Sequence, residues 1–135
     1  MALSLRRIPF TLLWATLSGA SLLGTSAMAV VPIDQQTLQS WQNQSSKRPL
    51  LLDVRTKEEF AEGHIPGAIN ISHDQLIKRL AEIGDDRRLP VVVYCQSGRR
   101  AALAEAELEK AGFDHVYHLS GDYQGWVKSK QTVIK

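Results

Sequence analysis

The sequence predicts an α/β fold: one domain in which a parallel sheet is flanked by helices on both faces. Short apolar runs alternate along residues 30–135 with stretches of helical periodicity. Strands joined through helices pair in parallel by right-handed crossovers. The two clearest runs, Leu50–Val54 and Val91–Tyr94, are almost wholly apolar, which is typical of strands covered on both faces. The length suits a single modest core.

The chain enters the sheet through a short edge strand at residues 30–33. Asp34 is suited to cap a helix that runs to Trp41. Leu38 and Trp41 are spaced to share the inner face of that helix. A polar stretch then separates it from the strand at residues 50–54.

Thr56 begins a short helix, and Glu59, three residues on, completes a capping box. Gly63 ends this helix, and a turn-rich segment leads to a strand at residues 68–71. A further helix is expected over residues 74–83. Its apolar face would consist of Leu76, Ile77, Leu80 and Ile83.

The second half of the domain begins with the strand at Val91–Tyr94. A long helix is expected from Arg99 to Ala111, with Gly112 as the residue that ends it. A last strand at residues 116–119 and a helical piece at residues 123–130 complete the α/β alternation.

Residues 1–29 are predicted to be a cleavable signal peptide and residues 30–135 the mature domain. A positive start at Arg6 and Arg7 precedes an apolar stretch, which closes on the small residues around Ala29. A membrane-spanning helix needs about 20 predominantly apolar residues, and this run is too short and too polar. We therefore expect a periplasmic protein without stable membrane association after cleavage.

Charge argues against nucleic acid as a partner. The chain carries 16 Lys and Arg against 14 Asp and Glu. Two of the basic residues, Arg6 and Arg7, belong to the signal peptide, so the mature domain is formally neutral. It shows no basic stripe interleaved with aromatic residues.

The sequence holds one cysteine, Cys95, which excludes an intrachain disulfide. A buried core cysteine and a reactive thiol are both compatible with that count. Cys95 follows the strand at residues 91–94, where an open parallel sheet binds its ligands. We therefore expect its sulfur to be exposed at a site formed with the next five residues, Gln96, Ser97, Gly98, Arg99 and Arg100.

This position favours a thiolate. Free amides at a helix start and the helix dipole attract negative charge. Gly98 allows the backbone to curl so that several amides point at the sulfur, and Arg99 and Arg100 add positive charge. Each feature has a simpler explanation, because Gly98 could serve only the turn and the arginines only the solvated surface of a helix.

Three ordered segments resemble the rhodanese family. One runs from Leu51 to Ile71 and includes Asp53-Val54-Arg55 and Gly63-His64-Ile65-Pro66-Gly67. Another is Tyr94-Cys95-Gln96-Ser97-Gly98-Arg99-Arg100-Ala101, and the last is Ala111-Gly112-Phe113 with the more distant Trp126. With the export signal, the chain is similar to the small periplasmic rhodaneses of bacteria.

The resemblance implies a sulfurtransferase in which Cys95 is catalytic. Cys95 would take sulfur from thiosulfate as a persulfide and pass it to cyanide, a small thiol or a thiol protein. No metal or other cofactor is implied. The resemblance places Asp53 and Arg55 beside the active loop as supports. From the residues alone, Asp53 could equally be a structural cap or a partner for Arg100.

Two other functions remain open. A persulfide carrier or binding module with little turnover would have nearly the same sequence. A cysteine phosphatase or arsenate reductase would place five residues between its cysteine and arginine, whereas Arg100 leaves four after Cys95. The shorter loop suits a sulfur atom better than a phosphate.

Two further features bear on the site. Asp122 replaces the second of two adjacent glycines common in the family, and it would lie at the rim of the site or point to solvent. The four histidines are too dispersed to suggest zinc or copper. They are His64, His73, His115 and His118.

Overall fold

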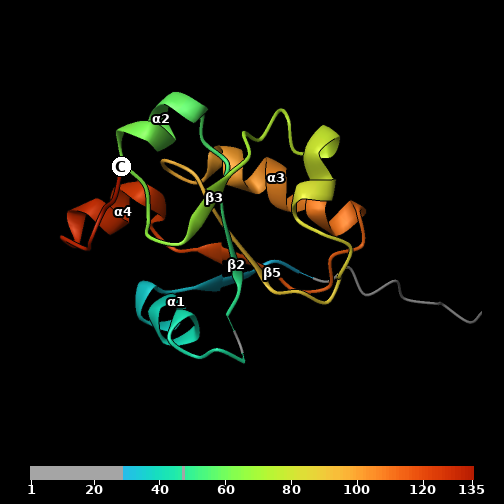
Figure 1. Ribbon diagram of the computed structural model, residues 1–135, viewed down its shortest axis with the longest axis horizontal. Helices are drawn as coiled ribbons and strands as arrows, with labels where there is room; N and C mark the ends of the chain where they lie inside the picture. Colours follow the sequence, from blue (N-terminus) through green and yellow to red (C-terminus); the bar gives the residue numbers. More distant parts are fainter. Residues whose placement is uncertain (1–28, 47) are drawn as a thin grey trace, which may run out of the picture.

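The computed structural model describes residues 29–46 and 48–135, so the predicted signal peptide lies outside the described residues except for Ala29 (Figure 1). In this part of the chain no helix is long and apolar enough to cross a bilayer. The strands are β1 (Val31–Ile33), β2 (Leu50–Asp53), β3 (Ala68–Asn70), β4 (Val91–Tyr94) and β5 (Val116–Leu119). The helices are α1 (Gln35–Gln42), α2 (Lys57–Glu62), the 3₁₀ helix η1 (Ile77–Glu82), α3 (Arg99–Lys110) and α4 (Asp122–Lys128).

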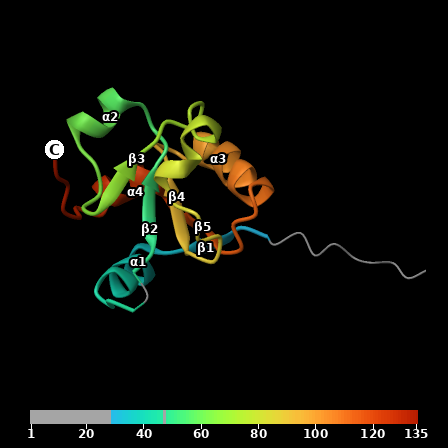
Figure 2. The same cartoon turned by 45° about the vertical axis from the view of Figure 1, so that its right-hand side comes forward.

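The five strands form one parallel sheet in the order β1-β5-β4-β2-β3. The predicted α/β class and the edge position of the first strand are thereby confirmed. β4 lies at the centre, between β2 and β5, so its carboxyl end opens near the middle of the sheet edge (Figure 2). Crossover helices force this parallel pairing, because the chain must return to the same end of the sheet before each new strand.

Helices cover both faces of the sheet, as predicted. Neighbouring residues of one strand face opposite ways, so Leu51 packs with Leu38 of α1 and Trp126 of α4 in one apolar cluster. Leu52 belongs to a second cluster, with Leu108 of α3. Figures 1 and 2 show α1 and α3 on opposite sides of the sheet.

Local sequence signals fix the helix ends. Asp34 Oδ1 accepts a hydrogen bond from the Thr37 amide at 2.7 Å, which confirms the predicted cap of α1. Thr56 and Glu59 form the predicted capping box at the start of α2. Gly112, the residue expected to end α3, has φ +91°, a conformation that glycine adopts without strain.

The helix predicted over residues 74–83 is wrong in extent and type. The chain instead forms turns and then η1, which has non-helical dihedrals at Arg79. Leu76 and Ile83 anchor the segment in the core, whereas Ile77 is 54% exposed. A 3₁₀ helix has three residues per turn, so the 3.6-residue period assigned Ile77 to the wrong face.

Candidate active site at the carboxyl end of β4

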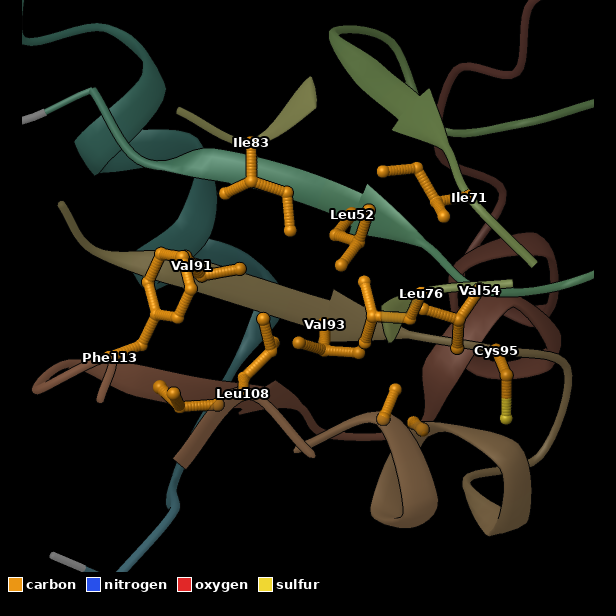
Figure 3. Close-up of a cluster of buried hydrophobic side chains, with 13 residues drawn as sticks. Leu52, Val54, Ile71, Leu76, Ile83, Val91, Val93, Cys95, Leu108 and Phe113 are labelled. Atoms are coloured by element: carbon orange, nitrogen blue, oxygen red, sulfur yellow. The ribbon is translucent and has the colours of Figure 1, made fainter. Parts of the chain in front are cut away.

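Cys95 lies where expected along the chain, immediately after β4, but its sulfur is not exposed as predicted. The side chain is 1% exposed and belongs to the apolar cluster on the α3 face of the sheet. Figure 3 shows it at one end of that cluster beside Val54, with Phe113 at the far end. We call residues 95–100 the cysteine loop.

The cysteine loop curls back over the sulfur, and this explains its burial. The Gly98 amide donates a hydrogen bond to Cys95 Sγ at 3.0 Å. The curl needs φ +109° at Gly98, where a side chain would be strained. Of the several amides expected at the sulfur, Gly98 supplies one such bond, and the amide of Cys95 itself donates to Asp122 Oδ1 at 3.0 Å.

The rest of the cysteine loop is more open. Gln96, Ser97 and Arg99 are exposed, so they lie where a solute would first meet the loop. A cation at the first turn of a helix opposes the helix dipole. The exposed Arg99 at the start of α3 therefore remains a predicted contact for an anion.

Arg100 is engaged by a carboxylate of α2. Its guanidinium donates to Glu59 Oε2 at 2.7 Å and to Oε1 at 2.9 Å, a bidentate pair. The bonds from Arg100 hold the pKa of Glu59 at about 2. Glu59 Oε2 also accepts a hydrogen bond from the Thr56 amide at 2.9 Å. Glu59 therefore ties the start of α2 to the start of α3.

Asp53 pairs with Arg55 and not with Arg100, one of the alternatives left by the sequence. Arg55 donates through Nε and NH2 to the buried Asp53 carboxylate, at 2.7 Å for the closest contact. The guanidinium also donates to the Gly63 carbonyl and lies 3.9 Å from the ring centre of Tyr123. Since the Tyr123 amide donates to the Cys95 carbonyl at 2.9 Å, this buried pair adjoins the cysteine loop.

Asp122 does not point to solvent, one of the two positions predicted for it; it lies close to the site, as the other alternative expected, but it is buried there and not at the rim. Asp122 is 3% exposed, and besides the Cys95 amide it bonds His118 Nε2 at 3.0 Å through Oδ2. His118 Nδ1 in turn bonds Glu105. We call these three residues the Glu105–His118–Asp122 network.

This network was missed in the sequence because its members lie on α3, β5 and α4. The departure from glycine at Asp122 was the one available signal. Hydrogen bonds to Asp122 and then Glu105 raise the pKa of His118 to about 10. His118 is therefore an imidazolium at neutral pH, between two carboxylates.

Within residues 29–46 and 48–135, no group of three or more His, Cys, Asp and Glu side chains is arranged to hold a metal ion.

Comparisons with known proteins point to one family. The family model described as rhodanese-like domain matches residues 35–129. A sulfurtransferase of Allochromatium vinosum is 36% identical over 85 residues, which cover 63% of this chain and 78% of the relative. Thiosulfate sulfurtransferase PspE of Escherichia coli is 36% identical over 70 residues, covering 52% and 67%. The crystal structure of the Alr3790 protein from Anabaena matches with a TM-score of 0.68 and 26% identity, covering 76% of this chain and 81% of that one.

Proposed function

Because this chain belongs to the rhodanese family, we propose that it is a thiosulfate sulfurtransferase in which Cys95 carries the transferred sulfur as a persulfide. One observation carries the proposal. The chain's one cysteine lies at the carboxyl end of the central strand, with the Gly98 amide directed at its sulfur. Relatives that are named sulfurtransferases support this assignment.

The proposed cycle consists of two displacements at sulfur. The Cys95 thiolate attacks the outer sulfur of thiosulfate, a new S–S bond forms, and the S–S bond of thiosulfate breaks with its electron pair on the departing sulfite. A cyanide ion or a thiolate then attacks the outer sulfur of the persulfide, and the Cys95 thiolate leaves. The sulfane sulfur is transferred without an external oxidant or reductant, and no separate general base is needed.

The exposed part of the loop suits an anionic donor. Arg99 supplies positive charge at the surface. Gln96 and Ser97 provide polar side chains next to Arg99, and the Gly98 amide is hydrogen-bonded to the sulfur. We propose these residues as the donor site. Arg100 contributes as the oriented cation of the Glu59 pair, since its guanidinium is already bonded.

The burial of Cys95 adds a step to this proposal. A donor cannot reach a side chain that is 1% exposed unless the covering loop opens. We propose that Gln96 and Ser97 move aside during sulfur loading while the Gly98 amide stays bonded to the sulfur. Asp53 and Arg55 stay in place beneath them, because both are buried and bonded to each other.

The deciding experiment is mass spectrometry of the protein, residues 30–135, after exposure to thiosulfate. We expect a gain of about 32 Da, one sulfur atom, on the peptide that contains Cys95, as expected for a reactive thiolate. Release of sulfite and repeated transfer to cyanide should accompany it. Cys95→Ser should keep the fold and lose both, and activity retained in that variant would overturn the proposal.

The same experiment separates the alternatives. One sulfur loaded per chain without repeated turnover would indicate a carrier. Hydrolysis of an aryl phosphate that depends on Cys95 would indicate a phosphatase.

We also propose that the protein acts in the periplasm after removal of residues 1–29. The charged, apolar and small-residue regions of that segment support this. Amino-terminal sequencing of the protein from a bacterial periplasmic fraction should begin at Val30. Recovery of the intact amino terminus in the cytoplasm would contradict it.

A further inference from the structure

Three charged side chains lie directly behind the cysteine loop, and the proposed cycle does not use them. Glu105 of α3 is 6% exposed, and Asp122 of α4 is 3% exposed. His118 of β5 bridges the two carboxylates. Burying charged groups is costly unless they are paired and hydrogen-bonded, so each member of this network depends on the others.

The network reaches Cys95 through its main chain. Asp122 Oδ1 accepts the Cys95 amide at 3.0 Å. On the other side of the same residue, the Tyr123 amide donates to the Cys95 carbonyl at 2.9 Å. The start of α4 therefore fixes the backbone of Cys95 from both sides.

The turning point of the cysteine loop also rests on the network. A methyl group added at Gly98 would lie 3.1 Å from Asp122 Oδ2 and 3.7 Å from the His118 ring. The Gly98 amide is the donor to Cys95 Sγ. Asp122 thus bonds the base of the segment that covers the sulfur, at Cys95, and its carboxylate lies beside the turn of that segment, at Gly98.

The backbone at Asp122 makes this contact notable. Its φ is +54°, a left-handed conformation that glycine adopts freely. A non-glycine residue held there is strained. The hydrogen bonds of the carboxylate to Cys95 and His118 offset that strain, and a glycine at this position would fit the backbone but leave the Cys95 amide without its acceptor.

We propose that Asp122, held in place by His118 and Glu105, is a positioning residue for sulfur transfer: it fixes the Cys95 amide and thereby keeps the sulfur beneath the Gly98 amide. This inference rests on the proposed role of Cys95 as the sulfur carrier. Asp122 does not touch the donor. It acts through the backbone of Cys95, and its negative charge is balanced by the imidazolium of His118, which Asp122 and Glu105 keep protonated at neutral pH.

The test compares Asp122→Gly with Asp122→Asn. Glycine removes the acceptor and suits φ +54°, so the fold should persist. Asparagine keeps an oxygen for the Cys95 amide. We would measure the rate of sulfur loading on Cys95 against thiosulfate concentration by mass spectrometry. Asp122→Gly should lower the maximal rate by about tenfold, the equivalent of one hydrogen bond, and change the half-saturating concentration less than about twofold.

Asp122→Asn should retain the maximal rate within about threefold, because its side-chain oxygen can still accept the hydrogen bond from the Cys95 amide. The matched control is Asp114→Gly, the same change at an exposed aspartate, which should load sulfur like the unaltered protein. Wild-type loading by Asp122→Gly, or equal loss in the glycine and asparagine variants, would overturn the inference.

A second readout does not depend on activity. Amide hydrogen exchange of Cys95, followed by NMR, should be at least about tenfold faster in Asp122→Gly, because that amide loses its acceptor. If the unaltered protein forms no persulfide but this exchange responds as expected, the proposed function fails while the contact stands. If persulfide forms and neither readout responds to Asp122→Gly, the positioning role fails alone.

Discussion

The sulfur of Cys95 combines two properties that usually oppose each other. Reactive cysteines are partly exposed and lie near positive potential, whereas structural cysteines are sealed in apolar surroundings. Cys95 is 1% exposed among core residues, yet the Gly98 amide bonds its sulfur at 3.0 Å. The conformation of a single glycine therefore brings a hydrogen-bond donor to a thiol that is otherwise enclosed by apolar side chains.

Replacement of Gly98 by alanine should test this. The variant should lose about 1–3 kcal/mol of stability, since φ is +109°. Its sulfur loading should slow by about tenfold, because the added methyl group meets Asp122 at 3.1 Å and displaces the amide from the sulfur. Urea unfolding and mass spectrometry measure the two effects.

Gly112→Ala is the matched control for that change. Gly112 has φ +91° and nothing lies within 4 Å of an added methyl group. It should show a similar loss of stability and unchanged sulfur loading. Equal loading by both variants would show that the turn at Gly98 is only structural.

The protonation of His118 makes the stability of the folded protein depend on pH. Its pKa is raised from 6.5 to about 10 in the folded protein, first by Asp122 and then by Glu105. A raised pKa means that the folded state binds the proton more tightly, so its contribution to stability is complete below pH 6.5 and is lost as the pH rises through about 10. Urea unfolding across this range should show the decline, and NMR titration of the His118 ring should have its midpoint near 10. A midpoint near the ordinary histidine value would contradict the ion-paired network.

At the scale of elements, α2 and α3 are joined at their starts by Glu59. This carboxylate completes the capping box of α2 and holds Arg100 in a bidentate pair. Helix caps contribute about 1 kcal/mol, and half-exposed ion pairs contribute less than that. The pair therefore orients Arg100 more than it stabilises the domain.

Glu59→Gln should lower the free energy of unfolding by about 1 kcal/mol at neutral pH. The pKa of Glu59 falls from 4.5 to about 2 in the folded protein. The stability it adds is thus present above pH 4.5 and is lost as the pH falls through about 2. The difference from the unaltered protein should shrink over that range in urea unfolding experiments. Glu58→Gln, an exposed neighbour in the same turn, is the control, and a loss as large as that of Glu59→Gln would contradict this account.

Elements that follow from local chemistry could be predicted, and those that depend on distant packing could not. The apolar run Val91–Tyr94 and the capping box at Thr56 identify their elements within a few residues of sequence. The segment before Ile83 could not be assigned correctly, since its conformation is set by which apolar side chains the sheet accepts. Leu76 is buried and Ile77 is not, a distinction absent from the sequence pattern.

The site shows the same division over the whole molecule. The cysteine loop is contiguous, so its place after β4 could be predicted. The burial of Cys95 and the partners of Arg100 and Asp122 come from α2, α3 and β5, which only the folded chain brings together. The carboxyl ends of parallel strands lie at one edge of the sheet. Residues at that edge support the cysteine loop from beneath.

The carboxyl-terminal tail, residues 132–135, is hydrogen-bonded to the turn after α2 and to α4. Ile134 exchanges two main-chain hydrogen bonds with His64, at 2.8 and 3.0 Å, and the Trp126 ring nitrogen donates to the Thr132 carbonyl at 2.8 Å. Figure 1 shows the chain end beside α2 and α4. The tail thus ties the turn after α2 to α4, and the carbonyl of Gly63 in that turn accepts from Arg55 at 2.7 Å.

Deletion of residues 132–135 should therefore destabilise the domain by about 1–3 kcal/mol, the worth of a few hydrogen bonds, measured by urea unfolding. Amide exchange at His64 should rise at the same time, because its acceptor is lost. Deletion of Lys135 alone keeps both bonds between His64 and Ile134 and should change neither quantity. If the longer deletion left stability and exchange unaltered, the tail would lie on the surface of the domain without stabilising it. The buried Asp53–Arg55 pair would then be held beneath the cysteine loop by the sheet alone.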